Sequence, residues 1–408
     1  MKLSTIIPVY SEKTSLAERW QKMPQAVWYG SIVFFCSRLI YSLWAIIILT
    51  LQPASAQAPQ PAIRNMLEQW LLAPWYRWDA VWFLKIAQEG YGVADGRSAY
   101  YPLYPTLIRL VGDLLGHNYL LSGLLVSNLA TWLALILLYA ITQRHYSDSV
   151  ARKTVIALTL YPFYIYNLIY YADSLLLLFS LATFWALETK RWGWVGVFAS
   201  LAVLSKLPGI VLLAPIGWEF LAQRRRLLSK DLFGVLAIPL TIAVWTVLLR
   251  LIGSEVNLID FSSPTSILTP ILTPSFQQRF QASMVFPWDG LILGIQAISA
   301  LWGRVLVLTV TMDMVMVVVF SLAIPFTLKL PRYSYFIYAV GLYLMNLTLV
   351  AESFPLVDFP RRMMVAFPVF IVFGLAMQWR WFNLFILFVG LFLSATVSAF
   401  LLWWLFVG

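Results

Sequence analysis

Charged residues are scarce in this sequence of 408 residues: only 11% are Asp, Glu, Lys or Arg, whereas 61% are hydrophobic. Soluble domains are nearer half apolar and a quarter charged. A soluble fold of this length would need far more polar surface than these residues supply. The low charge content therefore excludes a soluble enzyme or binding domain and predicts an integral membrane protein.

Cysteine and histidine are also rare, with one Cys and two His. Cys36 is alone in the first apolar run, so neither a disulfide framework nor a thiolate metal site is expected. His117 and His145 flank different apolar runs and cannot build a zinc site. The external carboxylates are too scattered for a cation site. The chain also lacks a Gly-rich phosphate-binding loop. We therefore predict no metal ion and no cofactor.

The charge that is present is mostly positive, with 28 Lys and Arg against 18 Asp and Glu, a net charge of +10. The basic residues cluster in short connections between apolar runs, as in Lys190-Arg191 and Arg224 to Arg226. The positive-inside rule expects this pattern of cytoplasmic loops. We therefore predict membrane lipids, and no nucleic acid, as the surroundings of the chain. The polar, basic N-terminus has no cleavage signature, so we expect residues 1–26 to form a retained cytoplasmic tail.

Apolar runs long enough to cross a bilayer recur along the rest of the chain. A helical span needs about 20 mostly apolar residues. Such runs lie at roughly 27–51, 119–142, 154–171, 172–188, 193–223, 232–253, 303–328, 333–351, 363–378 and 383–407, with a shorter one at 100–116. We predict an all-α, polytopic transmembrane helical bundle of about 10–12 membrane segments, in which residues 27–408 form one domain.

Two long connections, roughly 52–100 and 254–302, interrupt the apolar pattern. With the N-terminus inside, the first connection lies outside, and the basic clusters place the second outside as well. The first is rich in Trp and Tyr, which suits interfacial helices at the level of the lipid headgroups. Loops of this length in a compact protein are usually functional. We therefore expect the active site in these external loops.

The densest local signal runs from Trp75 to Tyr91. Asp79 comes just before an expected helix that ends near Gly90, a residue typical of the position after a helix. Two roles are open to Asp79. It could be an N-cap whose carboxylate satisfies the first free amides, or a base that accepts a proton from an acceptor hydroxyl. Spacing alone favours the cap, although the two roles are compatible.

The motifs in this region resemble those of the PIG-V family of mannosyltransferases. The family order is met by Trp78-Asp79, Phe83-Leu84, Ile86-Ala87, Gly90-Tyr91 and Tyr100-Tyr101-Pro102. Weaker similarity continues through Tyr171-Ala172-Asp173-Ser174, Lys206-Leu207-Pro208-Gly209 and Arg361 to Pro368. The chain departs from the family at Ala94-Asp95-Gly96, at Asp173 where Glu is usual, and at Trp82 where His is common.

The resemblance implies a GT-C fold, the architecture of multi-helix glycosyltransferases that take their sugar from a polyprenyl phosphate. It implies inverting transfer of mannose from polyprenyl-phosphate-mannose to a lipid-linked or cell-surface acceptor, with Asp79 as the base. A basic residue would stabilise the leaving phosphate. The residues that the resemblance and the local chemistry assign to substrate binding are Trp78, Glu89, Tyr91, Tyr101, Tyr171, Asp173, Lys206, Arg361 and Arg362.

Several alternatives stay open at this stage. Asp173 could be a helix N-cap, and Lys206 a turn residue at the membrane interface. Asp313 lies in an apolar run, and we expect it to pair with a basic group. The donor could carry another sugar, and a lipid or sugar transporter or a non-catalytic scaffold would fit the same composition. A small membrane partner subunit is also conceivable. We expect a bacterial plasma membrane with the active site facing outside, because the chain is compact and its one sequon, Asn346-Leu347-Thr348, lies in an apolar run.

Overall fold

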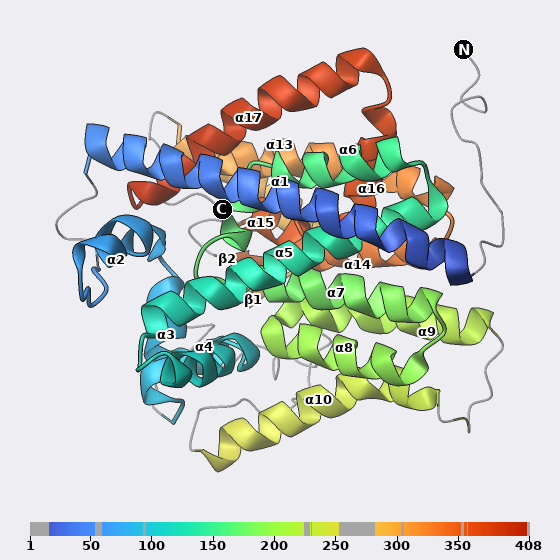
Figure 1. Cartoon of the computed structure of the whole chain (residues 1–408), viewed down its shortest axis with the longest axis horizontal. Helices are drawn as coiled ribbons and strands as arrows, with labels where there is room; N and C mark the ends of the chain where they lie inside the picture. The colour runs from blue at the N-terminus through green and yellow to red at the C-terminus, as the bar shows by residue number, and fades with distance from the viewer. Residues whose placement is uncertain are drawn as a thin grey trace.

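The computed structural model describes residues 16–53, 59–92, 95–223, 229, 231–252, 282–302, 306–351, 355–356 and 358–405. Within these ranges the chain is helical apart from one antiparallel pair of three-residue strands, β1 (Ala282–Met284) and β2 (Leu349–Ala351), with Ala282 opposite Ala351. The elements pack into one bundle of long helices with short helices at one end (Figure 1). The predicted all-α fold class is confirmed.

Five helices in the described residues are long and apolar enough to cross a membrane. They are Pro24–Leu51 within α1 (Leu16–Leu51), α5 (Tyr119–His145), α10 (Leu232–Leu251), Val307–Lys329 in α13 (Leu306–Ala323) with its 3₁₀ extension η7 (Ile324–Lys329), and α17 (Arg380–Leu402). Shorter helices pack between them: α6 (Asp148–Thr159), α7 (Asp173–Glu188), α8 (Trp192–Ser205), α9 (Leu213–Ala222), α14 (Tyr333–Thr348) and α16 (Phe367–Ala376). The protein is a multi-pass integral membrane protein.

Two of the predicted spans are broken. The run 154–171 is not one helix, because α6 ends at Thr159 and a 3₁₀ turn, η4 (Tyr164–Asn167), follows it. The run 193–223 is interrupted where the sequence indicated, by the 3₁₀ segment η5 (Leu207–Leu212) between α8 and α9. At this break a Cβ on Gly209 would lie 2.6 Å from the carbonyl carbon of Ala202. Only glycine therefore lets η5 fold back against α8, which holds Lys206 inside the bundle.

The first long connection contains the short helices that its aromatic composition predicted. They are α2 (Met66–Leu71), η2 (Ala73–Trp75), α3 (Ala80–Glu89) and η3 (Arg97–Ala99), followed by α4 (Leu103–Leu114). They gather beside the C-terminal end of α1 and the N-terminal end of α5 (Figure 1). Most of the second connection lies outside the described residues. Its described part comprises β1 and α12 (Pro287–Ala300).

The irregular segment between α6 and α7 is buried, which a membrane protein tolerates only when the backbone polar groups find partners. The carbonyl of Leu168 accepts hydrogen bonds from Arg38 Nη1 at 3.0 Å and from Asn128 Nδ2 at 3.1 Å. The carbonyl of Asn167 accepts one from Thr131 Oγ1 at 2.6 Å. Polar side chains of α1 and α5 thereby replace the missing helical bonds. The segment leads directly into Asp173, the first residue of α7.

Candidate active site

Asp79 precedes the first residue of α3 and presents a carboxylate that is 26% exposed. The preceding residue, Trp78, has a φ of 48°, a left-handed conformation that is costly for a bulky side chain and that clusters at functional sites. The Asp79 carboxylate makes no capping hydrogen bond to the helix. Asp79 thus occupies the predicted N-cap position of α3, and Gly90 follows its last residue, but the predicted capping by the carboxylate is wrong.

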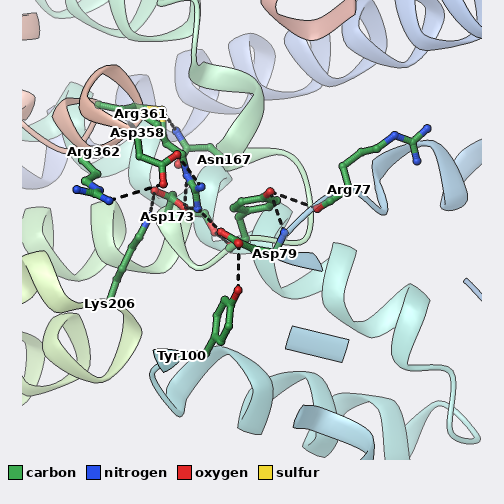
Figure 2. A network of polar contacts seen from close by, with 12 residues as sticks. Arg77, Asp79, Tyr100, Asn167, Asp173, Lys206, Asp358, Arg361 and Arg362 are labelled. Carbon is green, nitrogen blue, oxygen red and sulfur yellow. Dashed lines mark hydrogen bonds and ion pairs between the residues drawn. The ribbon is translucent and has the colours of Figure 1, made fainter. Parts of the chain in front are cut away.

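The carboxylate of Asp79 is instead bound by two side chains from distant elements (Figure 2). Its Oδ1 accepts a hydrogen bond from the Tyr100 hydroxyl at 3.1 Å, and its Oδ2 accepts one from Arg361 Nη2 at 3.1 Å. Its backbone N–H donates to the Tyr171 hydroxyl at 3.2 Å, and that hydroxyl donates to the carbonyl of Arg77 at 3.2 Å. Backbone and side chain of Asp79 are thus both held in place.

Asp173 forms the buried centre of the site, with a side chain only 1% exposed. Its Oδ1 lies 2.8 Å from Lys206 Nζ, and its Oδ2 lies 3.0 Å from Arg361 Nη2. The N-cap of α7 is Ala172, so Asp173 is not the capping residue that one sequence interpretation expected. Lys206 leaves the end of α8 and reaches the same carboxylate rather than forming a surface turn. Figure 2 shows the two cations on either side of Asp173.

Arg361 belongs to a short helix, α15 (Phe359–Met363). Its side chain is 4% exposed, and it also contacts Asp358 through Nη1 at 3.2 Å. Asp358 has a φ of 64°, a second strained residue at the site. The guanidinium of Arg361 lies 4.2 Å from the ring centre of Tyr171 and 4.8 Å from that of Tyr166, within the range of cation–π attraction.

Arg362 completes the cluster from the other side of Asp358. Its Nη2 lies 3.8 Å from Asp358 Oδ2, a long ion pair, while its buried Nη1 has no hydrogen-bond partner among the described residues. The cluster thus joins three carboxylates, from Asp79, Asp173 and Asp358, with three cations, from Lys206, Arg361 and Arg362. Balanced charge of this kind is what allows ionised groups to be buried together.

The predicted site residues divide into two groups. Asp79, Trp78, Tyr171, Asp173, Lys206, Arg361 and Arg362 come together in or beside the cluster. The other three lie along the neighbouring loop. Glu89 pairs with Arg97, the Tyr91 hydroxyl donates to the carbonyl of Tyr100 at 2.8 Å, and Tyr101 packs against the hydrophobic core. Their predicted contacts with substrate stay predictions.

Three members of the site were not assigned a role from the sequence: Tyr100, Tyr166 and Asp358. Tyr100 belongs to the aromatic motif Tyr100-Tyr101-Pro102, in which the resemblance assigns substrate binding to Tyr101. Asp358 lies three positions before Arg361. The signal that separates Asp358 from an ordinary loop carboxylate is its backbone conformation, which the sequence does not display.

The loop that leads to Tyr100 is closed by ion pairs. Lys85 Nζ lies 3.0 Å and Arg97 Nε 2.9 Å from Asp95 Oδ2, and Arg97 Nη1 donates to the Gly90 carbonyl at 2.8 Å. Partial burial opposes ionisation of Asp95, but the hydrogen bonds from Lys85 and Arg97 outweigh it and lower the pKa of Asp95. The loop is therefore pinned by a carboxylate that is ionised at neutral pH.

Asp313, the buried carboxylate of α13, differs from the sequence expectation. Its side chain is buried, and its Oδ1 has no hydrogen-bond partner among the described residues. The expected pairing with a basic group is therefore not seen for this oxygen. Among the residues that the structure describes, no group of three or more His, Cys, Asp or Glu side chains is arranged to hold a metal ion.

The comparisons with known proteins concern both the sequence and the fold. Residues 99–249 match the family described as dolichyl-phosphate-mannose-protein mannosyltransferase. This range includes Tyr100, Asp173 and Lys206. The search of curated proteins returned no match. The family match is a similarity over this part of the chain alone.

Solved structures with a similar arrangement include two kinds of membrane enzyme. ArnT from Cupriavidus metallidurans bound to undecaprenyl phosphate has a TM-score of 0.46 and 15% identity, over 85% of this chain and 60% of that one. An Archaeoglobus fulgidus oligosaccharyltransferase complex with Zn and sulfate has a TM-score of 0.44 and 12% identity, over 89% and 53%. The chain thus spans little more than half the length of these structures, and at such identities the likeness concerns the fold alone.

Proposed function

We propose that this protein transfers mannose from polyprenyl-phosphate-mannose to a lipid-linked or cell-surface acceptor on the outer face of its membrane. The observation that carries the proposal is the position of Asp79. Its carboxylate is partly exposed, yet Arg361 links it directly to the buried cations around Asp173. A base beside a cluster of cations suits a reaction that removes a proton and releases a phosphate. The matched family and the PIG-V-like motifs support the same reaction.

The chemistry is a single inverting displacement. The acceptor oxygen forms a bond to the anomeric carbon while the bond from that carbon to the phosphate oxygen breaks. The acceptor proton passes to the carboxylate of Asp79. The bonding electron pair leaves with the phosphate, which changes from a monoanionic diester to a monoester dianion. Because Asp79 loses one negative charge as the phosphate gains one, the net charge of the site stays constant through the step.

The three cations of the cluster have different roles toward the phosphate. Arg361 contacts three carboxylates, those of Asp79, Asp173 and Asp358, which occupies its fork of donors. Lys206 carries three N–H donors, and the structure gives it one carboxylate partner. Arg362 has a buried Nη1 without a partner among the described residues. Lys206 and Arg362 are therefore the groups that we assign to the leaving phosphate, with Arg361 as the link to the base.

The distribution of basic residues supports an external site. Gln143 Nε2 donates to Gln25 Oε1 at 3.0 Å, and Lys153 Nζ donates to the Met377 carbonyl at 2.9 Å. The helix segments that carry these residues therefore meet, at the end of the bundle away from α3 (Figure 1). The connections at that end are basic. The basic residues of these connections and of the adjoining helices include Arg144, Arg152, Lys153, Lys190, Arg191, Arg332 and Arg380. The positive-inside rule places such an end in the cytoplasm and Asp79 on the outside.

The experiment that tests the proposal measures transfer of label from radiolabelled polyprenyl-phosphate-mannose by membranes that contain the chain. Wild type is compared with Asp79→Asn at matched expression. We expect label in an extractable product with the wild type and none above background with the variant. Consumption of another polyprenyl-phosphate sugar in place of the mannose donor would overturn the sugar assignment. Equal activity of the two proteins would overturn the role of Asp79.

A further inference from the structure

Tyr100 binds the carboxylate of Asp79 on the side opposite Arg361. Its hydroxyl donates to Oδ1 at 3.1 Å, whereas Arg361 donates to Oδ2. Figure 2 shows the phenol pointing at the carboxylate from the side away from the cations. The two oxygens of Asp79 therefore have chemically different partners, one a hydroxyl and the other a guanidinium.

The Tyr100 ring is held by the helix that Asp79 begins. Tyr100 stacks on Trp82 with the ring centres 6.1 Å apart and the planes within 7° of parallel. It also meets Phe83 edge-on, at 5.1 Å between ring centres. Both aromatic residues belong to α3, so the hydroxyl and the carboxylate share one rigid support. Such a support fixes a catalytic geometry more closely than a free loop could.

The backbone of Tyr100 is fixed by the loop that precedes it. Its N–H donates to the Arg97 carbonyl at 3.0 Å, and its own carbonyl accepts the Tyr91 hydroxyl. Arg97 is anchored in turn by Asp95 and by the Gly90 carbonyl. Tyr100 is only 8% exposed. The ordered loop 95–100 thus delivers one hydroxyl to one carboxylate oxygen.

We propose that Tyr100 is the positioning residue of the base, and that Asp79 Oδ1 is the oxygen that takes the acceptor proton. This inference rests on the proposed function for its chemistry. A guanidinium only donates hydrogen bonds, so a proton placed on Oδ2 would have to compete with Arg361. A hydroxyl both donates and accepts. Oδ1 can therefore gain the proton while Tyr100 turns from donor to acceptor, and no partner is lost.

The hydrogen bond from Tyr100 has a measurable consequence besides activity. A hydrogen bond to one oxygen of a carboxylate makes its two oxygens inequivalent and alters its stretching frequency. Tyr100→Phe keeps the ring and its packing but removes this donor, so the carboxylate band of Asp79 should shift in the variant. Infrared difference spectra of the full-length protein in lipid nanodiscs report this band directly. The Asp79 band is the one that disappears in Asp79→Asn.

The matched control is Tyr104→Phe. The Tyr104 ring also meets Phe83 edge-on, at 5.0 Å between ring centres, but its hydroxyl donates to the Gly123 carbonyl at 2.9 Å. We expect Tyr100→Phe to shift the carboxylate band of Asp79 relative to the wild type. Tyr104→Phe should leave that band in place.

Activity profiles separate this inference from the proposed function. Tyr100→Phe should lower kcat by roughly tenfold, with the KM for the donor unchanged. A shifted infrared band in a protein that is inactive on every donor would refute the proposed function and leave Tyr100 as the partner of Asp79. An unchanged band in Tyr100→Phe would overturn the role of Tyr100, whatever the activity.

Discussion

Lys206 Nζ lies 2.8 Å from Asp173 Oδ1, and this ion pair joins the end of α8 to the start of α7 inside the bundle. The Asp173 side chain is 1% exposed and the Lys206 side chain 22%. A buried carboxylate between two cations is stable only while the charges balance. The pair therefore shapes both the fold and the site.

Asp173→Asn should destabilise the protein by roughly 3–5 kcal/mol, because it removes the carboxylate partner of Lys206 and one of the three carboxylates that Arg361 contacts. The measurement is thermal unfolding in detergent or nanodiscs. The double variant Asp173→Asn with Lys206→Met should recover part of the loss, because it removes the charge that lost its partner. Asp113→Asn, which removes an exposed pair with His117, is the control and should change the unfolding temperature little. Equal unfolding temperatures for wild type and Asp173→Asn would contradict this prediction.

Arg362→Gln should weaken binding of the sugar donor. Arg362 has a buried Nη1 without a partner among the described residues, and we assign that donor to the phosphate. Loss of a hydrogen bond to a charged group costs about 1.5–3 kcal/mol, so the KM for the donor should rise roughly tenfold or more. The measurement is the dependence of the initial transfer rate on donor concentration.

Arg109→Gln is the control for Arg362, since Arg109 is an exposed arginine on α4. It should leave the KM unchanged. If the KM rises in Arg361→Gln but not in Arg362→Gln, Arg361 binds the phosphate in place of Arg362, and our assignment of the two arginines is wrong.

Asp95→Asn should lower stability in a pH-dependent way. The pKa of folded Asp95 lies below its ordinary value of 3.8, so its ion pairs contribute fully above about that pH. The contribution is lost as the pH falls through the lowered folded value. Thermal unfolding of wild type and Asp95→Asn should therefore differ at neutral pH and converge in acid.

The source of the Asp95 effect can be tested with its partner. In the background of Lys85→Gln, the effect of Asp95→Asn should shrink, because one of the two cations that favour the carboxylate is gone. A difference between wild type and Asp95→Asn that persists unchanged in acid would mean that the loop is not held by these ion pairs.

The orientation can be tested by labelling single cysteines. With Cys36 replaced by Ser, cysteine is introduced at Gln88 on α3 or at Ser149 on α6, both exposed positions at opposite ends of the bundle. A membrane-impermeant maleimide applied to intact cells should label Gln88→Cys and spare Ser149→Cys until the membrane is permeabilised. The reverse pattern would place Asp79 in the cytoplasm and refute an external site.

Much of the fold could be predicted because it depends on local composition. Apolar runs separated by basic turns identify membrane helices, and the Lys206-Leu207-Pro208-Gly209 break is visible as a Pro-Gly interruption. The segment after Thr159 could not be predicted, since its sequence is as apolar as a helix. It leaves the helical conformation because side chains such as Arg38 and Thr131, from α1 and α5, satisfy its carbonyls.

The membrane class, the aromatic loop and the candidate base Asp79 could be predicted from residue types and their order over short distances. The partners of that base depend on the packing of distant segments. Arg361 is 282 positions from Asp79 and 188 from Asp173, and no local pattern sets such distances. The strained backbone of Asp358 and the choice of Tyr100 over Tyr101 also arise from packing. Pairing among buried charges depends on where helices from distant parts of the chain bring them together.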